Sequence, residues 1–410
     1  MNYKSTKYQL LFIMIGFLCH INYSYADSYN FNNPPACGSS VSSEEGPAIN
    51  AQAECAIAPE PVKNITNPSM QLPDREAWNL FIANNRAAFE KQPFWLSWPE
   101  QSEVFPASPH AKNPPTWKAI ADIEPHFKGR RSKQHEQRLV PTMTSSACAT
   151  FNSGLEEVRI NQVAFKYIID NNLWFTQGKA ARFDLGTPVS FPSGSRELKA
   201  NWISQKNAKA ALGHPIDLTN YFWKKDVKGN VWLLVAMHMI DRSIPNWLWS
   251  TFEHKDNPCF NTYLKAQDNF GVNENGDTST ELKGLFKKNG MNVKLWSNYR
   301  LDGAQTDFTL GGLGRPIIIG NSVTEYSFQT TASCMTCHSR ATTDYTGQGS
   351  LSIFTPDGQS YNGVPHPSWF YSSFKPATLK YMPLDFLWSV ALCPNAVGTK
   401  TQNCPRSDPT

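Results

Sequence analysis

Two cysteines and a histidine stand at a spacing that suits covalent attachment of a cofactor. The run Cys334-Met335-Thr336-Cys337-His338 has the pattern C-x-x-C-H, the attachment signature of a c-type haem. Two thiols three positions apart on one helical turn can each form a thioether bond to a haem vinyl group. The adjacent His338 can then bind the iron as its proximal axial ligand. The sequence therefore predicts one covalently attached haem c, held by Cys334, Cys337 and His338.

Other kinds of site also use closely spaced cysteines. A thioredoxin-like redox pair would open a helix after a strand in a βαβ unit, whereas here Thr-rich and Ser-rich sequence flanks the motif. A zinc site would need a second ligand pair at similar spacing, and Cys393 and Cys404 are too far apart to provide one. A further alternative is an exported structural protein whose C-x-x-C-H motif carries no haem.

The sixth coordination position of the iron has several candidates. Met382 follows the motif in a loop flanked by Pro383, and pairing of a Met thioether with His is an established haem ligation. His238 and His254 are alternative ligands. The competing interpretations are an ordinary core methionine and hydrogen-bonded core histidines. If the position is open, His238, His254 and Glu253 are candidates for distal acid or base groups.

The N-terminus has the three regions of a secretory signal peptide. Lys4 and Lys7 supply positive charge, residues 10–18 form an apolar stretch, and residues 24–26 read Ser-Tyr-Ala, a small-x-small cleavage site. The stretch is short for a membrane anchor, which is the alternative. Cleavage after residue 26 would release an exported, periplasmic protein, in which we expect no transmembrane segment.

The remaining cysteines suit an oxidising compartment. Besides the haem motif and Cys19, six cysteines are scattered along the chain, an even number that indicates disulfides. Disulfides that close short loops pair cysteines near each other in the sequence, which favours Cys37–Cys55 and Cys393–Cys404. The pair that is left is Cys148–Cys259.

Composition predicts a folded chain with a large core. Of 410 residues, 40% are hydrophobic and 12% aromatic, which argues against disorder. The net charge of +4 is too small for a dedicated nucleic-acid binder, so we expect no nucleic-acid partner. The expected organisation is a signal peptide (1–26), an irregular N-terminal arm (27–72) and a large haem-binding domain (73–410), which could form two packed lobes (73–300 and 301–410).

The elements that must position the motif are a mixture of helices and strands. Hydrophobic periodicity predicts helices over 74–91, with Asp74 as its cap, and over 161–171. Strands are expected at 158–160, 188–192, 197–203, 231–241 and 247–254, several of them apolar on both faces. Residues 93–145 indicate long loops and 266–294 a loop or weak helix. The predicted fold class is α+β, a β-rich core with surrounding helices and long loops, unlike the small all-α class I cytochrome c fold.

Blocks of residues along the mature chain are similar to a family of exported bacterial proteins described as cytochrome c family proteins. The haem motif is the specific feature, and the block Trp247-Leu248-Trp249-Ser250-Thr251-Phe252-Glu253-His254 is distinctive too. The other shared blocks are residues 77–81, 103–105, 161–162, 167–169, 197–202, 236–238 and 385–387. The resemblance implies one covalent haem in a large domain and supplies no substrate or partner.

Two functions follow from a haem c in an exported chain. The expected one is one-electron transfer as a periplasmic mono-haem cytochrome rather than a catalyst, with an unidentified redox partner protein. The second is a haem enzyme or a small-ligand sensor that uses an open distal iron site, for example for peroxide or nitrogen oxides. The size of the chain favours the second, because a simple electron carrier needs far fewer residues.

Overall fold

The computed structural model describes residues 67–89, 92–117, 130–131, 146–152, 154–310, 314–326, 328–353, 362–372 and 376–398. All of these residues belong to one compact unit within residues 37–410. The predicted signal peptide and most of the predicted N-terminal arm lie outside the described residues. The arm's last residues do not match the expectation of irregular chain, because Pro68–Gln71 form a short helix, α2, capped by Asn67.

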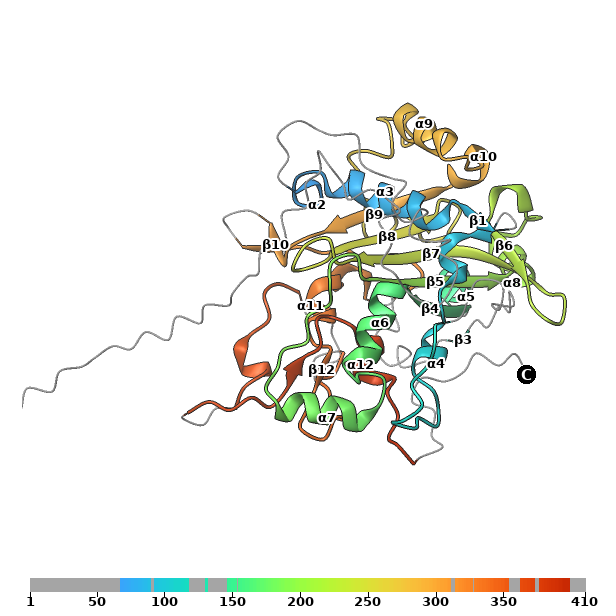
Figure 1. Cartoon of the computed structure of the whole chain (residues 1–410). Helices are drawn as coiled ribbons and strands as arrows, with labels where there is room; N and C mark the ends of the chain where they lie inside the picture. Colours follow the sequence, from blue (N-terminus) through green and yellow to red (C-terminus); the bar gives the residue numbers. More distant parts are fainter. Residues whose placement is uncertain are drawn as a thin grey trace, which may run out of the picture. The chain divides into compact units, whose positions relative to one another are not determined.

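A seven-stranded antiparallel sheet forms the centre of the described part of the chain (Figure 1). Its main path runs in the order β3-β4-β5-β7-β8-β9, and β6 pairs with β7. The strands are β3 (Arg130–Arg131), β4 (Leu155–Ile160), β5 (Arg196–Ser204), β6 (Trp223–Lys225), β7 (Val231–Asp241), β8 (Leu248–His254) and β9 (Tyr299–Gln305). Together with the surrounding helices, this sheet makes the fold α+β, as the sequence predicts.

One face of the sheet is covered by helix α3 (Pro73–Asn85). The Trp78 ring of this helix packs edge-on against the Phe252 ring of β8, with the two ring centroids 5.0 Å apart. The Phe81 ring packs against the same ring at a tilt, with centroids 4.7 Å apart. The helix ends earlier than predicted, since the backbone turns extended at Arg86 and continues into strand β1 (Ala87–Phe89). Asp74 does not cap the helix: it lies in the first turn, and its carboxylate accepts hydrogen bonds from Asn269.

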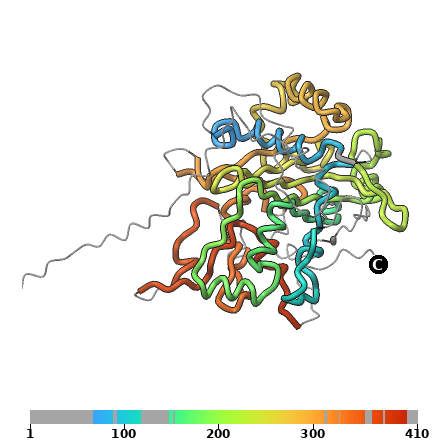
Figure 2. The backbone as a smooth tube through the Cα atoms, viewed as in Figure 1, coloured from blue at the N-terminus to red at the C-terminus, as the bar shows by residue number. Residues whose placement is uncertain are grey.

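The other face of the sheet carries the haem motif and a second apolar core. Helices α6 (Gln162–Asp170), α7 (Thr176–Asp184), α11 (Cys334–His338) and α12 (Trp388–Leu392) lie on this side, together with the short pair β12 (Thr342–Thr343) and β13 (Met382–Pro383). Figure 2 shows that the segment containing α6 and α7 runs beside the C-terminal segment. Residues from both segments, including Phe165, Trp174 and Val390, share one core with Trp249 and Met335.

The region predicted as long loops contains short elements, and the region predicted as a loop or weak helix, residues 266–294, contains a helix. Residues 93–117 include η1 (Phe94–Ser97) and α4 (Gln101–Val104), and residues 266–294 contain α9 (Thr280–Lys288) and the start of α10 (Val293–Trp296). The predicted strand at 188–192 is not a strand. There, the Ser190 and Phe191 amides donate instead to the side chains of Tyr167 and Asp385. The remaining elements are β2 (Gln92–Pro93), α5 (Ser146–Asn152), α8 (Gln205–Leu212), η4 (Leu218–Asn220), β10 (Thr309–Leu310), β11 (Arg315–Pro316), η5 (Gln329–Thr331) and η6 (Pro367–Trp369).

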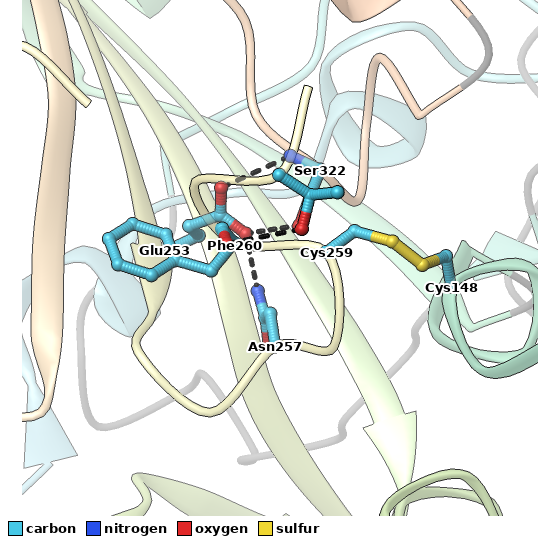
Figure 3. The surroundings of a disulfide bond; sticks show 7 residues. Cys148, Glu253, Asn257, Cys259, Phe260 and Ser322 are labelled. Carbon is cyan, nitrogen blue, oxygen red and sulfur yellow. Dashed lines mark hydrogen bonds between the residues drawn. A yellow bond between two sulfur atoms is a disulfide. The ribbon is translucent and has the colours of Figure 1, made fainter. Parts of the chain in front are cut away.

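A disulfide joins helix α5 to the loop after β8. Cys148 and Cys259 are bonded, with Cα atoms 5.7 Å apart, which confirms this predicted pair. The other two predicted pairs include Cys37, Cys55 or Cys404, which lie outside the described residues. Figure 3 shows Asn257 beside the disulfide, where its amide donates to the Glu253 carboxylate.

Within the described ranges, none of the helices combines the length and apolar character needed to cross a bilayer.

Candidate functional site

The haem motif forms one helical turn whose two inner residues anchor it. Met335 and Thr336 of α11 are fully buried. The Met335 amide donates to the side-chain oxygen of Gln305 on β9 at 3.1 Å, and the Thr336 hydroxyl donates to the Gly363 carbonyl at 2.6 Å. Cys334 and Cys337 are free thiols on the same turn and remain partly exposed. The motif is therefore fixed through its inner residues, while its two cysteines are not engaged in a disulfide.

His338 is held by a backbone carbonyl. Its Nδ1 lies 2.8 Å from the carbonyl oxygen of Phe386. Because a carbonyl oxygen only accepts hydrogen bonds, Nδ1 carries the proton, and Nε2 keeps a free lone pair. Burial lowers the pKa of His338 to about 3, against the smaller raising effect of this hydrogen bond. A neutral imidazole with a fixed tautomer is the form that binds a metal.

The carbonyl that holds His338 belongs to a strained turn. Asp385 and Phe386 both have positive φ angles, 48° and 73°. Such left-handed conformations of residues other than glycine cost roughly 1–3 kcal/mol each and persist only where the surroundings enforce them. The Asp385 carboxylate accepts a hydrogen bond from the Phe191 amide at 2.7 Å and lies 3.4 Å from the Arg242 guanidinium. These contacts hold the turn, and with it the orientation of His338.

The Trp249 ring packs against the imidazole and is in contact with a further aromatic ring. The Trp249 ring lies 4.6 Å from the His338 ring and 5.8 Å from that of Phe386. Phe308 follows at 6.3 Å from Phe386. These rings exclude water from one side of His338. Exclusion of water and control of local polarity are the means by which a protein adjusts the reduction potential of a bound iron.

Two charged side chains act electrostatically on the motif. Burial raises the pKa of Cys337 to about 11, and the negative charge of Glu325 raises it further, while Lys199 opposes this. Burial, followed by the negative charge of Glu325, also raises the pKa of Cys334. Both cysteines are therefore neutral thiols near neutral pH. Glu325 and Lys199 come from a loop and from β5, and neither is recognisable from the sequence as part of the site.

Met382 occupies an ordinary core position. It lies on β13 beside Thr343 and is 3% exposed, in the same apolar cluster as Met335 and Leu384. This is the usual setting of a core methionine. Ligation by Met382 stays a prediction, since its contacts do not distinguish it from its apolar neighbours.

His238 lies on the sheet face that carries the motif. On β7 it pairs laterally with Lys199 of β5 and Thr251 of β8. Its Nε2 is 3.0 Å from the Asn321 amide nitrogen and 3.6 Å from the Glu325 carboxylate. Burial, followed by the charges of Lys199 and His338, holds the pKa of His238 well below its usual range. The structure therefore brings His238 into electrostatic reach of His338.

His254 lies on the opposite face of the sheet. It is five residues along β8 from Trp249, a distance of about 17 Å at the usual rise of a strand. Its side chain is fully buried and stacks on Tyr221 with ring centroids 3.8 Å apart. Nε2 contacts the Asn220 carbonyl at 3.0 Å, and Nδ1 accepts from the Asp256 amide at 3.2 Å. This arrangement leaves His254 no free nitrogen for a metal.

Glu253 is also committed elsewhere. It is fully buried and accepts hydrogen bonds from the amide and hydroxyl of Ser322 and from the side chain of Asn257 (Figure 3). These donors occupy both carboxylate oxygens. Of the three residues considered as distal acid or base groups, only His238 is brought toward the motif.

The residues around the motif fit a covalently bound haem. Two free, partly exposed cysteines and an imidazole with a free Nε2 stand together on one turn, with the Trp249 ring beside the imidazole. A thioredoxin-like site fits less well, because α11 follows a 3-10 helix rather than a strand and the main sheet is antiparallel. No pattern in the sequence predicted that the Phe386 carbonyl or Asn321 would belong to the site. Trp249 and Phe386 do stand in the blocks of residues that resemble the cytochrome c family proteins.

A partly buried carboxyl group ties α12 to the sheet beside the motif. Glu197 of β5 accepts a hydrogen bond from the Ser389 hydroxyl. Burial raises the pKa of Glu197 to about 7, against the lowering effects of Ser389 and Lys199. The folded protein therefore binds this proton more tightly than the unfolded chain does. As pH rises from the unfolded pKa near 4.5 through about 7, ionisation of Glu197 reduces the stability of the fold.

The Glu197→Gln substitution is expected to stabilise the protein at pH 8 relative to pH 5. A glutamine cannot ionise, so the variant escapes the loss that the wild type suffers as pH rises. Allowing for partial exposure, we expect its free energy of unfolding relative to wild type to be about 1–2 kcal/mol more favourable at pH 8 than at pH 5. Urea unfolding at both pH values measures this, with Glu274→Gln in an exposed turn as control. An equal effect of Glu197→Gln at both pH values would refute the prediction.

Searches against protein-family models, curated proteins and solved structures each returned no match to this chain. Function is therefore inferred from the site itself.

Proposed function

We propose that the chain is an exported mono-haem c-type cytochrome that transfers single electrons. Cys334 and Cys337 would hold the haem through two thioethers, and His338 would be its proximal ligand. The observation that carries the proposal is the pairing of two free, partly exposed cysteines with a neighbouring imidazole whose Nδ1 is fixed by the Phe386 carbonyl. That hydrogen bond leaves Nε2 unprotonated, as ligation of iron requires.

The haem would supply an iron that changes between two oxidation states. The chain's own residues would hold the cofactor and set its surroundings. Trp249 and Phe386 exclude water beside His338, and the strained turn at Asp385 fixes the imidazole before any metal binds. An imidazole that is held in one orientation moves little when the charge on the iron changes.

Export supports the same function. The disulfide between Cys148 and Cys259 is compatible with an oxidising compartment such as the periplasm. The N-terminal signal pattern and the resemblance to exported cytochrome c family proteins agree with this location. A redox partner protein in that compartment would deliver or accept the electron.

The experiment is to produce the full chain with its signal sequence in a host whose periplasm attaches haem c. A pyridine haemochrome spectrum with c-type band positions is expected, together with an intact mass that exceeds the polypeptide by one haem. The bound haem should reduce and reoxidise reversibly. A colourless mature protein with the mass of its amino acids alone would reject the proposal.

A second candidate function, a small-ligand haem protein, is favoured by the polar groups on the sheet. His238, Asn321 and Glu325 contact one another on the sheet face that carries the motif, where an apolar surface would suffice for electron transfer. Carbon monoxide distinguishes the two functions. Binding to the reduced native protein would favour a ligand-binding role, and a low-spin spectrum that carbon monoxide does not change would favour electron transfer alone.

A further inference from the structure

Asn321 has a fixed orientation on the sheet face that carries the motif. Its side-chain oxygen accepts hydrogen bonds from the amides of Val323 at 2.9 Å and Thr324 at 2.7 Å. Its side-chain nitrogen donates to the Thr251 hydroxyl at 3.0 Å. If the oxygen and nitrogen of this amide were exchanged, the side-chain NH2 group would face two backbone N–H donors and no acceptor. The observed orientation is therefore the one that satisfies every group. The atom that Asn321 presents to His238 is therefore a donor.

This donor determines where His238 carries its proton. The Asn321 nitrogen lies 3.0 Å from His238 Nε2, which must therefore accept, and a neutral imidazole then has its hydrogen on Nδ1. Glu325 stabilises the loop, because its carboxylate accepts a hydrogen bond from the backbone N–H of Asn321 at 2.8 Å. Among the described residues, Nδ1 of His238 has no hydrogen-bond partner.

The position of His238 suits a role toward the cofactor. It is the one ionisable side chain of β7 between Val231 and Ile240, and its side chain keeps 16% exposure although both flanking residues are fully buried. Its lateral neighbour on β8 is Thr251, which shares a face of that strand with Trp249, and the Trp249 ring lies 4.6 Å from the His338 ring. His238 therefore lies on the side of the sheet where His338 packs. With Nε2 engaged by Asn321, His238 retains a free N–H donor and no free lone pair.

We propose that His238 does not ligate the iron but donates a hydrogen bond from Nδ1 to a small inorganic anion bound at the site, with Asn321 as the positioning residue that fixes its tautomer. The inference rests on the proposed function only for the covalent haem. It extends the second candidate function, the small-ligand haem protein, by naming the ligand class, small anions that accept hydrogen bonds. It requires that the sixth position of the iron would be open to exchange.

Fluoride is the probe, because it accepts hydrogen bonds and cannot donate them. We expect fluoride to bind the oxidised holoprotein with a change in the visible spectrum. His238→Leu is expected to weaken fluoride binding by a factor of roughly 10 to 100, the range for a hydrogen bond to a charged group. His238→Gln, which keeps a side-chain N–H, is expected to retain part of the affinity. The electron paramagnetic resonance spectrum of the resting iron should show the same axial nitrogen ligation in wild type and His238→Leu.

Asn321→Ala tests the positioning role. Without the fixed amide, the His238 ring can present either nitrogen, so fluoride affinity should fall while the haem content per chain stays at the wild-type level. A purely structural role for Asn321 would instead lower haem content or stability and leave the fluoride affinity of the intact holoprotein unchanged.

Several results would overturn the inference. Loss of a nitrogen ligand from the resting iron in His238→Leu would show that His238 ligates the metal. Absence of fluoride binding to the wild type, or equal affinity in wild type and His238→Leu, would remove the donor role. In each of these cases the pyridine haemochrome still reports a covalent haem, so the proposed function survives. A chain without haem rejects both.

Discussion

Replacing both Cys334 and Cys337 by alanine is expected to abolish covalent haem attachment. The two thiols are the partly exposed, unpaired cysteines of α11, and each would form one thioether. The wild-type chain should carry one haem that resists extraction by acidified organic solvent. The double variant should lose that haem completely, and each single variant should retain at most one thioether. Intact mass spectrometry combined with haem extraction measures the attached fraction.

Met335→Leu is the matched control for this experiment. Met335 stands between the two cysteines and is fully buried, and leucine conserves its volume and apolar character. This variant should keep the wild-type haem content. If the double alanine variant held a covalent haem equal to that of wild type, the thiols of α11 would not be the attachment points.

Removing the disulfide is expected to produce the largest loss of stability from a change outside the site. Cys148 and Cys259 are separated by 111 residues, and both are nearly fully buried. A cross-link over about 100 residues contributes up to about 4.7 kcal/mol by restricting the unfolded chain, and measured costs of removal are about 2–5 kcal/mol. We expect the Cys148→Ala/Cys259→Ala variant to lose about 3–4 kcal/mol of unfolding free energy in urea.

Ala149→Ser, next to Cys148 on α5, controls for disturbance of the helix itself and should change the free energy by less than about 0.5 kcal/mol. The haem content of the disulfide variant should equal that of wild type under conditions where it is folded. The loop around Cys259 retains its other anchors, among them the bond from the Asn257 amide to the Val235 carbonyl. An unfolding free energy equal to that of wild type would show that the cross-link contributes nothing.

The accuracy of the sequence predictions differs between elements for physical reasons. Strand β7 (Val231–Asp241) was predicted with its observed bounds, because its apolar residues continue on both faces, the pattern of a strand that is buried on both sides of a sheet. The helix predicted over 74–91 was too long. Ala87, Ala88 and Phe89 are compatible with a helix, but the chain turns at Arg86 to pair β1 with β2. Local preference was overridden there by an antiparallel contact.

The predicted strand at 188–192 failed for a related reason. The segment is apolar and flanked by prolines, which is a local strand pattern. Its amides are satisfied by the side chains of Tyr167 and Asp385 rather than by a neighbouring strand. Whether an extended segment joins a sheet depends on which partner the rest of the fold places beside it, and that partner is not visible in the local pattern.

The amino-acid sequence by itself determined the C-x-x-C-H motif as the candidate site, because covalent attachment of a haem would depend on three residues within one helical turn. The tertiary structure alone decided what surrounds that turn. His338 is oriented by a carbonyl 48 residues away, and His238 receives its donor from Asn321, 83 residues away. Such long-range partners depend on how the loops pack on the sheet, which no short pattern of residues encodes. For the same reason, only the fold could separate His238, on the motif side of the sheet, from His254 on the other.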